Sequence, residues 1–207
     1  MGDAVWSIVV AGGSGARFGE RKQYLPLLGT RVLDWSLRAA AAHTDGVVLV
    51  VPADVADAAE PDVQAVVAGG ASRSASVRAG LAAVPADAAV IVVHDAARPV
   101  PVPEVWDRVL AAVAAGADAA VPGVPVGDTL REIGGTTVDR SRFVAVQTPQ
   151  AFRAAALRAA HEGDPEGTDD ASLVEAGGGR VVVVDGDPGN IKITTPVDLA
   201  LAELLCR

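Results

Sequence analysis

Strands that are apolar from end to end recur along this chain and alternate with segments of helical period. Residues 8–11, 47–51 and 89–93 are such runs, and Leu33 and Leu37 begin an apolar face at helical spacing. A strand that is buried on both faces must lie in a sheet with helices on both sides. The pattern therefore predicts an α/β fold with a mostly parallel, Rossmann-like sheet. Without a repeat or a linker, we expect one domain over residues 1–207.

The first strand ends in a glycine-rich loop. Gly12, Gly13 and Gly15 follow it, and Arg17 and Lys22 lie just beyond. Glycines let successive backbone N–H groups turn toward an anion, and the cations neutralise what those amides hold. The loop indicates a phosphate site, while a glycine-rich turn with solvated cations is the alternative interpretation.

Spacing narrows the kind of phosphate loop. Lys22 is not followed by Ser or Thr, which excludes a Walker-type loop. In a dinucleotide fingerprint Gly13 and Gly15 would fit, but Phe18 occupies the position of the third glycine. Asp54, just after the second apolar strand, keeps an NAD-binding protein as a weak alternative.

Composition limits the partners. The net charge of -9 disfavours a nucleic-acid surface, so an anionic substrate must meet a local cluster of cations. Of 17 basic residues only Lys22 and Lys192 are lysines, and both lie in stretches that look like sites. The single Cys206 cannot form an intramolecular disulfide and favours a reducing cytoplasm. We expect a cytoplasmic protein without a membrane segment.

Two further polar clusters follow apolar strands. Asp95 ends a buried run, where its carboxylate could hold Mg²⁺ or could brace the loop by pairing with Arg98. We expect His94 to be structural. In the cluster after Gly70, we expect Ser74 to cap a helix and Ser76 to contact a ligand. The carboxyl ends of parallel strands share one edge, so these clusters should converge with the glycine loop.

Residues 128–147 depart from the parallel pattern. The runs 129–133 and 136–146, divided by Gly134 and Gly135, predict a projecting β-hairpin arm. Such an arm usually has a partner, and a symmetric homodimer is the expected one. Beyond the arm, we expect a helix near residues 152–161 and a helix cap at residues 168–170.

In order and spacing, the motifs of this chain resemble those of the 2-C-methyl-D-erythritol 4-phosphate cytidylyltransferase family almost end to end. They are Ala11-Gly12-Gly13-Ser14-Gly15-Ala16-Arg17 with Lys22-Gln23-Tyr24, Gly69-Gly70 with Arg73 and Ser76-Val77, His94-Asp95-Ala96-Ala97-Arg98-Pro99, Asp128-Thr129, Val138-Asp139-Arg140, Thr148-Pro149-Gln150, Thr168-Asp169-Asp170 and Gly189-Asn190-Ile191-Lys192.

The resemblance implies that an oxygen of methylerythritol phosphate attacks the α-phosphorus of CTP and releases pyrophosphate, a step of the non-mevalonate isoprenoid pathway. It also implies a homodimer in which the neighbouring subunit supplies the arm. Such a transfer depends on positioning and charge stabilisation more than on a covalent nucleophile. The site residues that it implies are catalytic Arg17, Lys22, Arg140 and Lys192; CTP-binding Ala11, Gly12, Gly13, Gly15, Gly70, Ser76 and Ala96; substrate-binding Arg98, Thr129, Arg140 and Thr148; and Asp95 for Mg²⁺ or another divalent cation.

One departure from the family pattern affects the glycine loop. The family usually has a longer segment here and a proline directly before the lysine, whereas this chain has Arg21 before Lys22. Lys22 could approach the phosphates from another angle, or Arg21 could share its role. A cytidylyltransferase for a pentitol phosphate such as ribitol 5-phosphate and a non-catalytic nucleotide-binding module remain alternatives.

Overall fold

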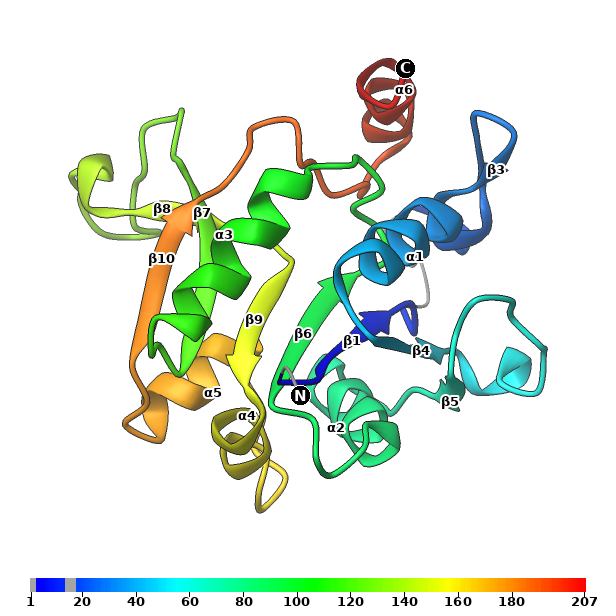
Figure 1. Ribbon diagram of the computed structural model, residues 1–207. Coiled ribbons are helices and arrows are strands. Elements are labelled where there is room, and N and C mark those ends of the chain that lie inside the picture. The colour runs from blue at the N-terminus through cyan, green and yellow to red at the C-terminus, as the bar shows by residue number, and fades with distance from the viewer. Residues whose placement is uncertain (1–2, 14–17) are drawn as a thin grey trace.

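One mixed sheet with helices packed on both faces forms the body of this computed structural model, which describes residues 3–13 and 18–207 (Figure 1). The strands of this sheet are β1 (Val5–Val10), β4 (Gly46–Val51), β5 (Ala65–Ala68), β6 (Val90–Asp95), β7 (Ala119–Pro125), β8 (Val144–Val146), β9 (Gln150–Arg153) and β10 (Val181–Asp185). The helices are α1 (Val32–His43), α2 (Arg73–Ala83), α3 (Pro103–Ala114), α4 (Ala154–Ala160), α5 (Asp170–Ala176) and α6 (Pro196–Leu205).

The strand order is β10-β7-β9-β6-β1-β4-β5, with β8 paired to β7. β5, β4, β1 and β6 run parallel, as do β10 and β7. β9 lies between β6 and β7 and is antiparallel to both, and β8 is antiparallel to β7. The predicted α/β class with a mostly parallel sheet is confirmed. A separate pair of short antiparallel strands, β2 (Pro26–Leu27) and β3 (Thr30–Arg31), follows the glycine loop.

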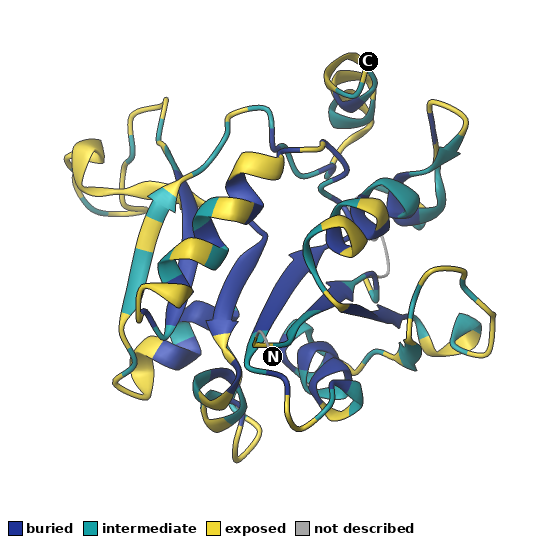
Figure 2. Ribbon diagram, viewed as in Figure 1, coloured by how far each residue is buried: buried dark blue, intermediate teal, exposed yellow. Residues whose placement is uncertain are grey.

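Alternate residues of the central strands enter two apolar layers, one on each side of the sheet. Ile8 packs with residues of α2, α4 and α5, whereas its neighbour Val9 packs with residues of α1 and α3. Figure 2 shows the buried strands between partly exposed helices. Each buried Val, Leu or Ile side chain contributes about 1.5–3 kcal/mol relative to exposure, so the two layers fix the sheet that carries the site.

The register of the parallel strands aligns their carboxyl ends. Val10 at the end of β1 lies opposite Asp95 at the end of β6. Beyond β5, the backbone N–H of Gly69 donates to the carbonyl of Val51 at 2.7 Å. The three polar clusters that follow β1, β5 and β6 therefore meet at one edge of the sheet.

The arm is less regular than the sequence predicts. Gly134, with φ of 75°, forms the expected turn, and a single bridge joins Arg131 to Thr137. The predicted continuous strand over 136–146 is wrong, because the chain forms a 3-10 turn at Arg140–Arg142 before β8. Asp139 caps that turn by accepting a hydrogen bond from the backbone N–H of Ser141 at 3.1 Å.

At the C-terminus, α6 begins as expected with Thr195 as N-cap and Pro196 in its first turn. Asp198 accepts from the backbone N–H of Thr195 at 2.7 Å and completes this start. Across the part of the chain that the structure describes, none of the helices is long and apolar enough to cross a membrane.

Candidate active site

A pocket of about 560 Å³ opens at the carboxyl ends of β1 and β6. It gathers side chains from the glycine loop, the start of α2, the end of β6 and the segment before α6. Its lining consists of Val10, Ala11, Gly12, Gly13, Phe18, Lys22, Gln23, Gly70, Ala71, Ser72, Arg73, Ser76, Asp95, Ala96, Ala97 and Lys192. Most of the predicted nucleotide-binding residues are thus brought together, while the predicted Gly15 and Arg17 lie outside the described residues.

Gln23 fixes the described part of the glycine loop from behind. Its buried side-chain amide donates to the carbonyl of Ala11 at 2.7 Å and to that of Gly13 at 3.2 Å. These two carbonyls are therefore turned toward Gln23. The N–H of Ala11 also donates to the carbonyl of Val50 in β4 at 2.7 Å, so a side chain and a neighbouring strand together hold the start of the loop.

The second wall of the pocket is the turn before α2. The hydroxyl of Ser76 donates to the carbonyl of Ser72 at 2.8 Å and accepts from the backbone N–H of Gly70 at 3.2 Å. A Cβ atom on Gly70 would lie 2.5 Å from the Cβ of Ala75, so the close turn requires glycine. The predicted cap was wrong: Ser72, not Ser74, caps α2 by accepting from the N–H of Ala75 at 3.0 Å.

Asp95 is the carboxylate of the pocket, and two cations hold it. Lys192 Nζ lies 2.6 Å from its Oδ2, and Arg73 Nε lies 3.7 Å from its Oδ1. Burial would raise the pKa of Asp95, but Lys192 and then Arg73 outweigh it and lower this pKa to about 2. Asp95 is therefore ionised at neutral pH. It does not brace its loop by pairing with Arg98, because Arg98 Nη1 donates instead to the carbonyl of Asn190 at 2.7 Å.

A buried polar group stands behind Asp95. The hydroxyl of Thr148 accepts from the backbone N–H of Asp95 at 3.0 Å and lies 3.1 Å from His94 Nδ1. His94 Nε2 is 3.2 Å from the carbonyl of Arg98, and burial lowers the pKa of His94 to about 4. Neutral His94 is structural, as expected. Asn190 joins the group by donating to the carbonyl of Thr148 at 2.9 Å, which fixes the segment that carries Lys192.

Of the two cations after the glycine loop, Lys22 lines the pocket and Arg21 turns away. Arg21 Nη2 donates to both carboxylate oxygens of Asp54, at 2.8 and 2.9 Å. Asp54 is thereby engaged on the surface rather than offered to a ribose. The arginine that replaces the family's usual proline is accounted for by this ion pair.

Predicted contacts with the second substrate lie elsewhere in the described chain. Arg98 and Thr148 are largely buried in the group behind Asp95. Thr129 and Arg140 lie on the arm, where the guanidinium of Arg140 donates to the carbonyl of Gly127. Of the described site residues, these four stand outside the pocket lining.

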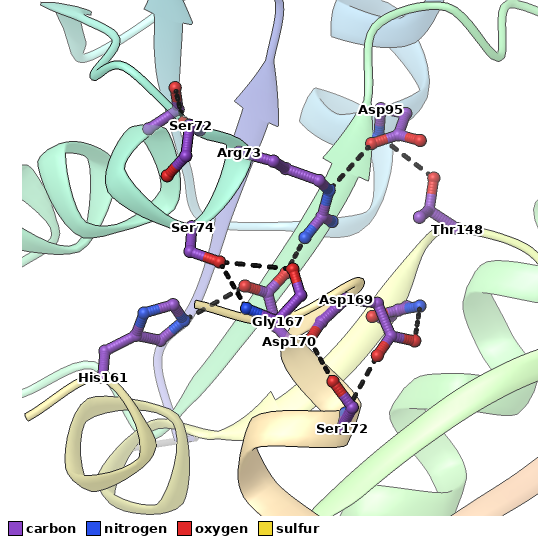
Figure 3. A network of polar contacts seen from close by, with 12 residues as sticks. Ser72, Arg73, Ser74, Asp95, Thr148, His161, Gly167, Asp169, Asp170 and Ser172 are labelled. Carbon is purple, nitrogen blue, oxygen red and sulfur yellow. Dashed lines mark hydrogen bonds and ion pairs between the residues drawn. The ribbon is translucent and has the colours of Figure 1, made fainter. Parts of the chain in front are cut away.

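Sequence reasoning missed one ion pair between Arg73, which lines the pocket, and a buried aspartate. Arg73 Nη1 lies 2.7 Å from Oδ2 of Asp170, which is completely buried (Figure 3). Asp169, not Asp170, is the cap of α5 and accepts from the N–H of Ser172 at 2.9 Å. The sequence held one signal for this pair: two aspartates stand side by side where a single aspartate is enough to cap the helix. The other aspartate, Asp170, is therefore available for a different partner.

Among the described residues, no group of three or more His, Cys, Asp or Glu side chains could hold a metal ion by itself. Asp95 nevertheless fits one kind of metal site, since Mg²⁺ commonly takes one or two carboxylates together with phosphate oxygens and water. The donor set therefore suits a cation that arrives with a nucleotide.

The fold and the site define a class of protein: an α/β nucleotide-binding enzyme of the nucleotidyltransferase type. A glycine loop, lysines and an ionised carboxylate meet where parallel strands end, the usual ligand position in such sheets. Comparison with known proteins identifies the family.

The family model of 2-C-methyl-D-erythritol 4-phosphate cytidylyltransferase matches residues 5–207. Proteins of that name from Nocardia farcinica and Saccharopolyspora erythraea are 44% and 42% identical, over 98% and 97% of this chain and 94% and 98% of their own lengths. The crystal structure of the Thermus thermophilus protein of that name matches with a TM-score of 0.82 and 39% identity, over all of both chains.

The chain belongs to the 2-C-methyl-D-erythritol 4-phosphate cytidylyltransferase family. It is a nucleotidyltransferase of non-mevalonate isoprenoid biosynthesis, which joins CTP and 2-C-methyl-D-erythritol 4-phosphate to give 4-diphosphocytidyl-2-C-methyl-D-erythritol and pyrophosphate. The NAD-binding alternative is thereby excluded.

The lowered pKa of Asp95 makes a prediction about stability. A carboxyl whose pKa is about 2 in the folded protein and 3.8 otherwise stabilises the fold above pH 3.8 and loses that contribution as pH falls toward 2. Between pH 5 and pH 3, wild-type protein should lose about 1 kcal/mol more of its free energy of unfolding than Asp95→Asn. Urea denaturation at both pH values measures this difference, and equal losses would contradict the charge assignment.

Proposed function

We propose that the pocket binds CTP with its triphosphate along the glycine loop and carries out cytidylyl transfer there. The pair of Asp95 and Lys192, 2.6 Å apart and lining the same pocket as Gly12 and Gly13, is the observation that carries this proposal. A carboxylate that stays ionised beside a partly exposed lysine suits a reaction in which phosphate charge must be balanced. Positioning and charge stabilisation supply most of the catalysis in such transfers.

The nucleotide-binding residues that we propose are Ala11, Gly12, Gly13, Gly70, Ser76 and Ala96, all of which line the pocket. Lys22 and Lys192 would neutralise the triphosphate and the charge that develops in the transition state. Lys192 is 38% exposed, so its ammonium group can leave Asp95 for phosphate oxygens when substrates bind. For Gly15 and Arg17, the family resemblance is the support for a role at the triphosphate.

Asp95 would hold Mg²⁺, or another divalent cation, together with oxygens of the bound nucleotide. When bound, such an ion supplies positive charge at the phosphate oxygens and orients them for in-line attack. The chain's own contribution is to keep Asp95 charged and to hold it in place. Thr148 holds Asp95 in place by accepting a hydrogen bond from its backbone N–H at 3.0 Å.

We further propose that methylerythritol phosphate is gripped by Thr129 and Arg140 from the arm of a partner subunit, together with Arg98. Thr148, predicted for the same role, is buried with its hydroxyl bonded to the N–H of Asp95, so its part is to hold Asp95 in place. The arm carries exposed apolar side chains, Ile133, Phe143, Val144 and Val146, which a second copy could cover. In this arrangement residues 1–207 act as one nucleotidyltransferase domain with an arm at about 128–147. Nucleic acid and membrane have no part in the proposal, and the cytoplasmic location stays a prediction.

Pyrophosphate release tests the choice of acceptor. With CTP and Mg²⁺, we expect turnover with 2-C-methyl-D-erythritol 4-phosphate and none above background with ribitol 5-phosphate. Turnover with ribitol 5-phosphate alone would favour the pentitol-phosphate alternative. Binding of CTP without turnover on either acceptor would favour a non-catalytic module.

The two cations after the glycine loop should differ sharply in their effect on rate. We expect Lys22→Ala to lower kcat by about 10²- to 10³-fold, as loss of a preorganised charge does in other enzymes. Arg21→Gln is the matched control, because Arg21 pairs with Asp54 on the surface, and its kcat should stay within about threefold of wild type. An Arg21→Gln effect as large as that of Lys22→Ala would show that Arg21 shares the phosphate role.

Supply of the arm by the partner subunit can be tested by complementation. Lys22→Ala and Arg140→Ala chains are each expected to be nearly inactive alone. Co-expressed in equal amounts, they should recover about a quarter of wild-type activity, because half of the dimers are mixed and each mixed dimer has one intact site. Sites built within one subunit would show no recovery.

A further inference from the structure

In the wall of the pocket, Arg73 lies between two carboxylates, those of Asp95 and Asp170 (Figure 3). Its Nη1 lies 2.7 Å from Asp170 Oδ2, whereas its Nε lies 3.7 Å from Asp95 Oδ1. The first distance is that of a charge-assisted hydrogen bond, and the second is too long for a hydrogen bond. The guanidinium is therefore committed to Asp170 and only near Asp95.

The surroundings of Asp170 keep its carboxylate in contact with Arg73. It is the first residue of α5, it is completely buried, and its other oxygen, Oδ1, lies 3.1 Å from Nε2 of buried His161. His161 thereby fixes the carboxylate so that Oδ2 faces Arg73. A buried ion pair of this kind is costly to desolvate, so it contributes little net stability to the fold.

The ion pair between Arg73 and Asp170 affects which oxygens of Asp95 are engaged. Its Oδ2 is engaged by Lys192 at 2.6 Å, and its Oδ1 is the oxygen that faces Arg73. Arginine binds carboxylates with two parallel hydrogen bonds where it can. Were Arg73 not held by Asp170, it could close on Asp95 and occupy the oxygen that a metal ion would need.

We propose that Asp170, oriented by His161, is a positioning residue that holds Arg73 off Asp95 and so keeps Asp95 Oδ1 open to a divalent cation. This inference rests on the proposed function, in which Asp95 holds that cation beside CTP. Asp170 lies beneath the pocket and acts only through Arg73. Its negative charge is a restraint on a neighbouring cation rather than a ligand.

The test measures how much a metal strengthens nucleotide binding, without turnover. Calorimetry gives the dissociation constant of CTP in EDTA and again in saturating Mn²⁺, and the ratio of the two constants is the metal enhancement. We expect Asp170→Asn to lower this enhancement about tenfold, in line with the loss of one charge-assisted hydrogen bond to Arg73. The double variant Arg73→Gln/Asp170→Asn should return to within about threefold of wild type, because the arginine that would close on Asp95 Oδ1 is gone while Lys192 still engages Oδ2.

The double variant shows whether Asp170 acts by holding Arg73 away from Asp95 or only by stabilising the fold. A merely structural Asp170 would leave the double variant as poor as the single one, and that result overturns the inference, as does an unchanged enhancement in Asp170→Asn. Asp169→Asn is the matched control: it removes the same charge one residue earlier, where the carboxylate caps α5, and should keep the enhancement. The EDTA measurement removes any direct effect of the substitutions on CTP.

A second variant covers the case in which Asp170→Asn does not fold. His161→Leu leaves both charges in place and removes only the group that orients Asp170, so the enhancement should fall about threefold. An unchanged enhancement in His161→Leu then overturns the inference. Wild-type protein that binds CTP no better with Mn²⁺ would overturn the proposed metal role itself, whereas the variant outcomes bear on Asp170 alone.

Discussion

An ionised carboxylate at the end of β6 is the constraint around which the site is arranged. Asp95 is nearly buried, and a buried carboxyl group without partners would take up a proton. Lys192 and Arg73 keep it charged, and they reach it from the segment before α6 and from the start of α2. The charge of Asp95 thus brings Lys192, which is 97 residues away in the sequence, into contact with the end of β6.

Each of those cations needs a support of its own. Lys192 follows Asn190, whose buried amide donates to the carbonyl of Thr148, and Thr148 in turn accepts from the N–H of Asp95. Arg73 is anchored by Asp170. Buried polar groups are costly unless they are hydrogen-bonded, so the supports and the site are stable only as a set. The antiparallel strand β9 matters here because it begins two residues after Thr148 and lies beside β6.

The fold was predictable wherever its cause is local. Continuous apolar runs identified the parallel strands, and the glycines after β1 marked the loop that lines the pocket. The prediction failed where the same local pattern is compatible with two kinds of secondary structure. Residues 152–153 read as the beginning of a helix but belong to β9, since pairing with β6 and β7 prevails over helical pattern there. On the arm, the cap at Asp139 interrupts a run that sequence alone suggests is one strand.

By itself, the sequence determined the α/β layers, the edge at which the site lies and, by resemblance, the family. Only the tertiary structure decided which charges face each other: Arg21 turns to Asp54 while Lys22 lines the pocket, and Asp170 holds Arg73. The physical reason is that periodicity and glycine placement act over a few residues and select a face or a turn. The partner of a charged side chain is chosen by chain segments that meet only after the sheet has formed.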